Sequence, residues 1–335
     1  MLKKIASVIL LGAMLFTVSC GGTPSADDLR GTVAASGDTV SANVPVVSYF
    51  YNDTVLSFLN HYAKVLDKLG LDPSKPLAGQ KMQNREETWH EYFLNSTFTL
   101  TYHLISLTEA AKAEGISLTD AEINAIRARA ERTAPGSYGP NVDNEAVFEA
   151  RVIEALAYKY QEIKEAELAP TADEIEAHAS EKNKKRNEDS TLNIRSVMLF
   201  DTGYGSRKAA RAKAEELLAL LEKDPSENNF TLISLEYSDD PSSCYAGGLY
   251  SDFAPGKSIA EIDKWCFEDG RKVGDIALVE SDYGCHIIYV ESEGLTVWQA
   301  EAAAEIVSER FEALCDTVHE KYFVTIAPEA VELIK

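Results

Sequence analysis

The sequence has few long apolar runs, and the longest is short for a permanent membrane-spanning helix. A permanent membrane helix needs about 20 apolar residues. The longest apolar stretch, residues 5–18, is shorter and includes three small or polar residues. It follows Lys3 and Lys4, and a basic start before a short apolar core is typical of a secretory signal. We therefore predict a signal peptide over residues 1–19.

The end of this signal predicts how the protein is attached. Residues 17–22 read TVSCGG and resemble the bacterial lipobox, whose Cys is acylated and becomes the mature N-terminus; Thr17 stands where Leu is usual. We predict lipidation at Cys20 and a lipid-anchored, extracytoplasmic protein of the bacterial cell envelope. The alternatives are an ordinary secretory signal with an incidental Cys and, as the weakest, a residual transmembrane anchor.

Large apolar residues are scarce directly after the predicted cleavage site. Residues 21–43 are mostly Gly, Ser, Thr, Ala and Asp. Such a composition cannot bury a core, so residues 20–43 are predicted to be a flexible tether.

Positive charge is also scarce. The chain has 32 Lys and Arg against 54 Asp and Glu, a formal net charge of −22. Such a surface repels nucleic acid and anionic headgroups, so we expect no nucleic-acid partner and membrane attachment only through the lipid. The same acidity helps to keep a protein that binds apolar clients soluble.

Cysteine and histidine are few, and their spacing matches no zinc pattern. We therefore expect no metal and no cofactor. Apart from Cys20, the cysteines are Cys244, Cys266, Cys285 and Cys315. An exported chain can form disulfides, but the sequence does not determine how these four would pair.

The first half of the chain has helical periodicity. Apolar residues recur at helical spacing over 48–69, 88–113 and 144–168, and again over 297–323. Thr119 with Glu122, and Thr171 with Glu174, have the spacing of capping boxes. The aromatic residues of 88–113 either form core, which is the commoner case, or line a groove for apolar client segments.

The pattern changes near residue 191. Residues 192–200, 276–279 and 286–290 read as strands. Residues 206–222, 232–235 and 259–267 read as helices, and residues 237–255 as a long loop with a Gly-Gly pair. Strands that are distant in sequence must pair in one sheet against helices, which indicates an α+β domain of about 100 residues.

This region contains an ordered set of motifs: 230–243 (FTLISLEYSDDPSS), Gly247-Gly248, 253–256 (FAPG), Phe267 and 284–288 (GCHII). Their order and spacing resemble the parvulin (PpiC-like) family of peptidyl-prolyl isomerases. The flanking helices resemble those of PrsA-type foldase lipoproteins and SurA-type periplasmic chaperones.

The resemblance implies a function and a site. It implies prolyl cis–trans isomerisation of exported proteins, coupled to holding of unfolded or proline-containing clients. The implied polar centre is Asp240 and His286, with Ser196 where the family has its first His. The implied proline-binding residues are Phe253, Ile259, Ile262 and Phe267. Cys244 and Cys285 are expected to flank this pocket, and we predict no redox function.

We predict an isomerase with chaperone helices and modest activity, because Asp240, His286 and the pocket residues are retained. Two alternatives remain open: a binding-only chaperone with a degenerate isomerase domain, which Ser196 favours, and a lipoprotein scaffold for envelope assembly. Architecturally, we expect a parvulin-like domain with an antiparallel-rich sheet and surrounding helices, inserted into an all-α chaperone-like lobe. The expected domains are a helical domain over 44–188, the parvulin-like domain over 189–293, and a C-terminal helix over 294–335 that packs on the first lobe.

Overall fold

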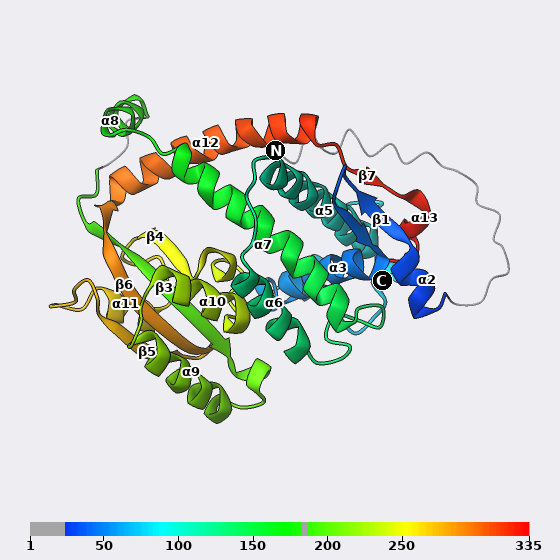
Figure 1. Cartoon of the computed structure of the whole chain (residues 1–335), viewed down its shortest axis with the longest axis horizontal. Helices are drawn as coiled ribbons and strands as arrows, with labels where there is room; N and C mark the ends of the chain where they lie inside the picture. The colour runs from blue at the N-terminus through cyan, green and yellow to red at the C-terminus, as the bar shows by residue number, and fades with distance from the viewer. Residues whose placement is uncertain (1–23, 183–185, 335) are drawn as a thin grey trace. The chain divides into compact units, whose positions relative to one another are not determined.

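The computed structural model describes residues 24–182 and 186–334 (Figure 1). Cys20, the predicted lipidation site, lies outside the described residues. The chain forms two compact units. Unit 1 comprises the residues through Ile116, Arg132–Ala157 and the residues from Cys315 onward; unit 2 comprises Ser117–Glu131 and Tyr158–Leu314. Within the described ranges, no helix has the length and apolar character that a membrane crossing requires.

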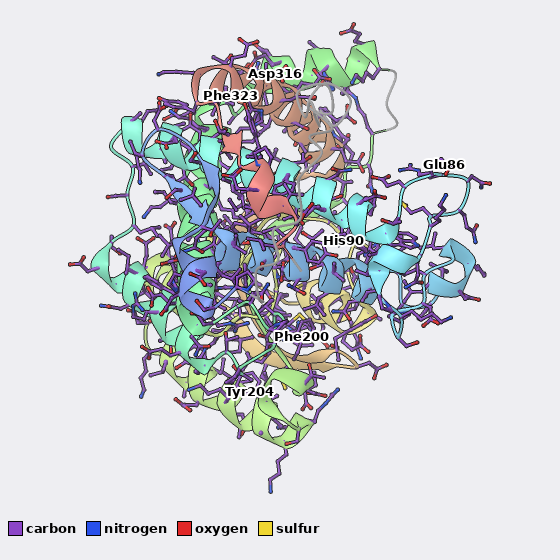
Figure 2. The ribbon with its side chains drawn as sticks, turned by 90° about the vertical axis from the view of Figure 1, so that its right-hand side faces the viewer. Glu86, His90, Phe200, Tyr204, Asp316 and Phe323 are labelled. Carbon is purple, nitrogen blue, oxygen red and sulfur yellow. The ribbon has the colours of Figure 1, made fainter. Side chains whose placement is uncertain are left out.

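Unit 1 is built mainly on two helices, α3 (Val44–His61) and α5 (Trp89–Ala113). The short helices α4 (Leu66–Leu69) and η1 (Leu77–Gly79) lie between them in the chain. Glu86, in the loop that precedes α5, projects into solvent with a 97% exposed side chain (Figure 2). The expected helix over 48–69 begins earlier because Asn43 caps it, its side chain accepting a hydrogen bond from Val46 N.

The aromatic residues of α5 are mostly core. Trp89, Phe93 and Phe98 are at most 5% exposed, and Thr88 caps the helix in a capping box with Glu91. This burial favours the core interpretation over a client-binding groove for these three residues.

The prediction of a flexible tether was wrong for residues 26–43. They form α2 (Ala26–Gly31), β1 (Val33–Ser36) and β2 (Ser41–Asn43). With β7 (Thr325–Ile326), the strands make an antiparallel sheet in the order β2-β1-β7, so unit 1 is not purely helical. The small side chains of Ala34, Ala35 and Ala42 are fully buried. The small residues that suggested a flexible tether instead allow this sheet to pack closely in unit 1.

Unit 2 contains a four-stranded antiparallel sheet in the order β4-β3-β6-β5. Its strands are β3 (Ser190–Phe200), β4 (Leu249–Phe253), β5 (Ile276–Ser281) and β6 (Gly284–Thr296). The prediction that residues 237–255 are a loop missed β4, which is short and contains Asp252 at φ 50°. The α+β class is confirmed.

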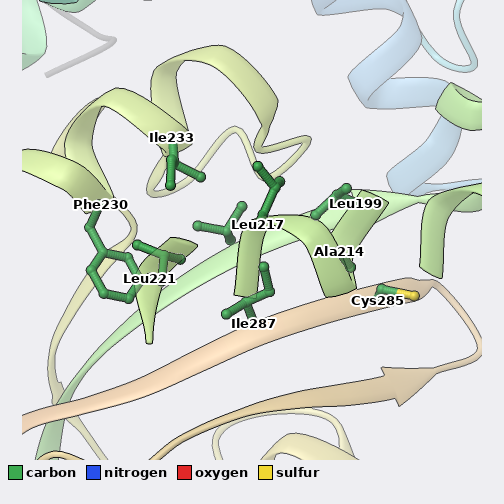
Figure 3. Packing of buried hydrophobic residues seen from close by; sticks show 9 residues of the cluster. Leu199, Ala214, Leu217, Leu221, Phe230, Ile233, Cys285 and Ile287 are labelled. Atoms are coloured by element: carbon green, nitrogen blue, oxygen red, sulfur yellow. The ribbon is translucent and has the colours of Figure 1, made fainter. Parts of the chain in front are cut away.

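Helices α9 (Arg207–Leu221) and α10 (Glu227–Tyr237) pack on one face of this sheet. Figure 3 shows this core, in which Leu199 and Ile287 of the sheet meet Leu217, Leu221 and Phe230 of the helices. Helix α11 (Ala260–Cys266) packs on the other face. Phe200 ends β3, and Tyr204 follows in η2 (Asp201–Tyr204), at the edge of the Figure 3 core (Figure 2).

The remaining helices of unit 2 are α6 (Asp120–Arg132), the C-terminal half of α7 (Asn144–Glu167), α8 (Ala172–Glu181) and the first part of α12 (Val297–Lys321). Both predicted capping boxes are present, at Thr119 with Glu122 and at Thr171 with Glu174. Ile175 of α8 packs against Trp298 and Ile306 of α12. From Cys315 onward, α12 belongs to unit 1.

Candidate functional site

The predicted polar and apolar site residues share one face of the unit 2 sheet. Side chains alternate between the two faces of a strand, and Ile194 and Ile288 contact α11 on this face. Ser196 of β3 and His286 of β6 have the same parity as these two residues. The register pairs Met198 with His286 and Ser196 with Ile288. The pairing of distant strands therefore places Ser196 and His286 close together.

His286 lies in a buried, hydrogen-bonded position. It is 3% exposed, and its Nε2 is 2.8 Å from Ser281 Oγ at the end of β5. Ser281 Oγ also accepts a hydrogen bond from Tyr283 N at 3.2 Å. Burial lowers the pKa of His286, although the charges of Asp240 and Glu261 act in the opposite direction. The imidazole is therefore neutral near pH 7.

Asp240 is held as a hydrogen-bond acceptor. It is 8% exposed. Its Oδ2 accepts hydrogen bonds from Ser243 Oγ and from the Tyr250 hydroxyl, both at 2.5 Å, and its Oδ1 accepts one from Ser242 N at 3.0 Å. Burial, followed by the charge of Asp240, raises the pKa of Tyr250, which keeps the phenol protonated as a donor.

Ser196 lies on the same sheet face, but it is not the hydrogen-bond partner of His286. It is 6% exposed, and its backbone N donates to Gly248 O at 2.8 Å. The side-chain oxygen bonded to His286 is that of Ser281, a residue that the sequence analysis missed. The expected strands, 276–279 and 286–290, left Ser281 in the connection between them, so the sequence carried no signal for this contact.

The four predicted proline-binding residues form one cluster. Phe253, Ile259, Ile262 and Phe267 pack together with Ile194 and Ile288. The rings of Phe253 and Phe267 stack at 5.9 Å with an interplanar angle of 8°. Ile262 is buried, whereas the other three are half-buried, so the cluster presents apolar surface to solvent beside the polar centre.

The cysteines lie in apolar surroundings. Cys244, Cys266, Cys285 and Cys315 are all buried. Cys285 belongs to the core under α9, on the sheet face opposite His286, so the expectation that it flanks the pocket was wrong. Burial raises the pKa of Cys266 to about 12 and also raises that of Cys285. Within the two described ranges, no group of three or more His, Cys, Asp or Glu is arranged to hold a metal ion.

The candidate site thus combines a neutral buried imidazole, a hydrogen-bonded carboxylate and an aromatic pocket. Residues 158–293 match the family model of the PPIC-type PPIase domain. The chain therefore contains a parvulin-type domain, and the match begins in α7, before the predicted boundary at 189.

The sequence is also similar to individual foldases. It is 38% identical over 78 residues to the foldase protein PrsA of Geobacillus kaustophilus (strain HTA426), covering 23% of this chain and 26% of that protein. The chain thus matches about a quarter of the length of this curated relative. A crystal structure of PrsA from Bacillus subtilis aligns with 78% of this chain and 90% of its own, at 19% identity and a TM-score of 0.30. A SurA-like chaperone of Campylobacter jejuni aligns with 62% of this chain and 93% of its own, at 16% identity and a TM-score of 0.27.

Proposed function

We propose that the protein is an extracytoplasmic folding factor that catalyses cis–trans isomerisation of X-Pro bonds in exported polypeptides and holds unfolded clients. The observation that carries this proposal is the half-exposed aromatic cluster around Phe253 and Phe267, on the sheet face that also holds His286. An apolar cluster of this kind accepts a proline ring, and Tyr250 of the same cluster is hydrogen-bonded to the buried Asp240.

The reaction requires rotation without bond cleavage. The barrier is about 18–20 kcal/mol because rotation breaks the amide resonance, and the uncatalysed step takes tens to hundreds of seconds. A site accelerates rotation by binding the twisted imide more tightly than the planar one. In this domain, the apolar cluster would fix the ring while Asp240 and His286 provide a preorganised polar setting.

Asp240, His286 and Ser196 differ in the roles we propose for them. Asp240 would hold the Tyr250 hydroxyl beside the pocket, to which Tyr250 belongs. His286 would act as a neutral polar group, oriented by Ser281. Ser196 would leave space at the sheet face where a larger imidazole otherwise stands, and its position would be fixed by the backbone contact with Gly248.

The test is an isomerisation assay on X-Pro peptides by NMR exchange, with wild type beside His286→Ala. We expect kcat/KM to fall roughly a hundredfold, the effect of losing one polar group at a reacting centre. His178→Ala is the matched control, because His178 contacts Glu305 on α12 and is not part of the pocket cluster. Equal activity in His286→Ala and wild type would remove His286 from the mechanism.

A second function is favoured by a specific observation. His286 has a serine partner, Ser281, and Ser196 occupies the place of the family's first His. A binding-only chaperone would bind proline peptides through the same apolar cluster and suppress aggregation without speeding isomerisation. Peptide binding with no catalysis in wild type would establish this function in place of the first.

We also propose lipid anchoring at Cys20, on the basis of residues 17–22. A Cys20→Ser variant would lose incorporation of labelled fatty acid and move from the membrane fraction to the extracytoplasmic soluble fraction. A variant that stays in the membrane fraction would show that another segment anchors the protein.

A further inference from the structure

A cavity of about 240 Å³ lies on the other side of β4 from the proline pocket. Its wall includes the C-terminal half of α7 and the segment 241–251. Side chains alternate over residues 249–251 of β4: Leu249 and Ser251 line the cavity, whereas Tyr250 belongs to the pocket cluster. The positive φ of Asp252 breaks the alternation, so that Phe253 also belongs to the pocket cluster. The segment begins directly after Asp240. The cavity and the proline pocket therefore share one strand and one loop.

The charge of the cavity is negative. Glu162 and Glu165 of α7 both line it. The basic residues whose charges act on Glu162 already have acidic partners: Lys159 with Glu122, and Arg195 with Glu291. Burial and the charge of Glu227 raise the pKa of Glu162, outweighing the opposite effect of Arg195. A cation bound in the cavity would offset the unfavourable burial and like-charge repulsion of the Glu162 carboxylate.

The aromatic part of the wall suits a planar cation. Tyr158 of α7 and Tyr245 of the loop both line the cavity, and their rings stack at 5.2 Å with an interplanar angle of 6°. Guanidinium groups pack on aromatic rings and bind carboxylates with a planar set of donors, which ammonium groups lack. Two carboxylates beside aromatic rings therefore match arginine better than lysine.

We propose that this cavity binds an arginine side chain of the client polypeptide, next to the proline held in the isomerase pocket. The inference rests on the proposed function for the nature of the ligand, a client chain. It adds a preference for clients that carry a basic residue near the proline. The site is formed by Glu162, Glu165, Tyr158 and Tyr245.

The test is an NMR titration of the ¹⁵N-labelled mature protein with N-acetyl-arginine methylamide and with its citrulline counterpart. The two probes have the same shape, but only the first is charged. We expect saturable shifts at the amides of 241–251, with the arginine probe binding roughly fivefold more tightly, as one partly screened ion pair provides. Glu162→Gln should abolish this preference.

Glu222→Gln is the control, because it removes the same charge from the exposed end of α9. If Glu162→Gln fails to fold, Glu165→Gln is tested instead, since both residues line the cavity. Equal binding of the two probes by wild type, or a preference that persists in the Glu162→Gln and Glu165→Gln variants, would overturn the inference. The isomerisation assay tests a separate claim. Catalysis without a preference for arginine would refute only arginine binding in the cavity. A preference for arginine without catalysis would refute only the isomerase activity.

Discussion

At the residue scale, unit 1 contains a pair of histidines, His103 half-buried and His319 buried, that has no role in the proposed isomerase. His103 Nδ1 of α5 lies 3.1 Å from His319 Nε2 of α12. The Tyr102 hydroxyl donates to His319 O at 2.9 Å. Burial, and then the charge of His319, lowers the pKa of His103 to about 4. Burial also lowers the pKa of His319, against the opposing charge of Asp316 (Figure 2). Two cations at this distance repel, so the pair is stable only with at most one proton shared between the facing nitrogens.

This pair predicts an acid-sensitive unit 1. Histidine in an unfolded chain titrates near pH 6.5, so between about pH 6.5 and about pH 4 the unfolded state binds more protons than the folded one. The free energy of unfolding therefore falls as the pH falls, by about 2 kcal/mol for His103 between pH 7 and pH 5. Urea unfolding at the two pH values should show a smaller loss in His103→Gln than in wild type.

His61→Gln is the control for this measurement, because His61 is exposed. It should lose as much stability between pH 7 and pH 5 as wild type does. If His103→Gln and wild type lost the same amount, the pair would not be the source of the acid sensitivity.

At the element scale, the turn before β4 predicts a strict requirement for glycine. Gly248 has φ +76°, and a Cβ at this position would collide with the backbone carbonyl of Ser196. The Gly248→Ala variant must push β4 away from β3, and Tyr250 would then move relative to the pocket. We expect it to lower the free energy of unfolding by about 2–4 kcal/mol and to reduce isomerisation. Thermal unfolding and the peptide assay measure the two effects.

The Gly256→Ala variant distinguishes the energetic cost of the Cβ collision at Gly248 from the cost of a positive φ alone. Gly256 has nearly the same φ, +75°, but a Cβ there would meet no atom within 4 Å. We expect this variant to lose only about 1 kcal/mol, the cost of a positive φ in alanine. A Gly248→Ala variant no less stable than Gly256→Ala would show that β4 can shift without cost.

Elements with regular periodicity could be predicted from the sequence. Helices α5, α7, α9 and α12 and strand β3 lie close to the expected ranges. Strand β6 was expected over 286–290 but extends to Thr296. Strands β1, β2 and β4 were missed because each is five residues or fewer. A strand that short carries too little periodicity, and β1 depends on a partner near the other end of the chain.

Parts of the site could be predicted only through the resemblance to parvulins. It identified His286 and the four pocket residues, which the structure brings onto one sheet face together with Ser196, and Asp240, which is bonded to Tyr250 of the pocket cluster. Ser281 was missed because its role depends on the β5–β6 register, in which it lies opposite Gly284. The cavity behind β4 was missed because α7 and the loop 241–251 are about 80 residues apart in sequence.

At the scale of the whole molecule, the N-terminal and C-terminal segments of the described chain pair with each other in unit 1. Strand β7 pairs with β1, and Ala327 N donates to Ala34 O at 2.9 Å. Ile334 is 1% exposed, and Asn141 Nδ2 donates to Leu333 O at 3.2 Å. The C-terminal segment thus covers the edge of the sheet that the N-terminal segment begins. Unit 2 takes no residue from this segment, so the stabilities of the two units should respond differently to its removal.

Deletion of residues 325–335 tests this division. The deletion uncovers the edge of β1 and removes the buried side chain of Ile334, so we expect unit 1 to lose at least about 3 kcal/mol of unfolding free energy. Hydrogen exchange followed by mass spectrometry should show faster exchange in β1 and α3 and unchanged exchange in β3 and β6. A full-length Glu332→Gln variant, altered at an exposed position, is the control and should match wild type. Equal loss of protection in β3 and β6 would mean that the two units unfold as one, and that the isomerase domain depends on the C-terminal segment for its stability.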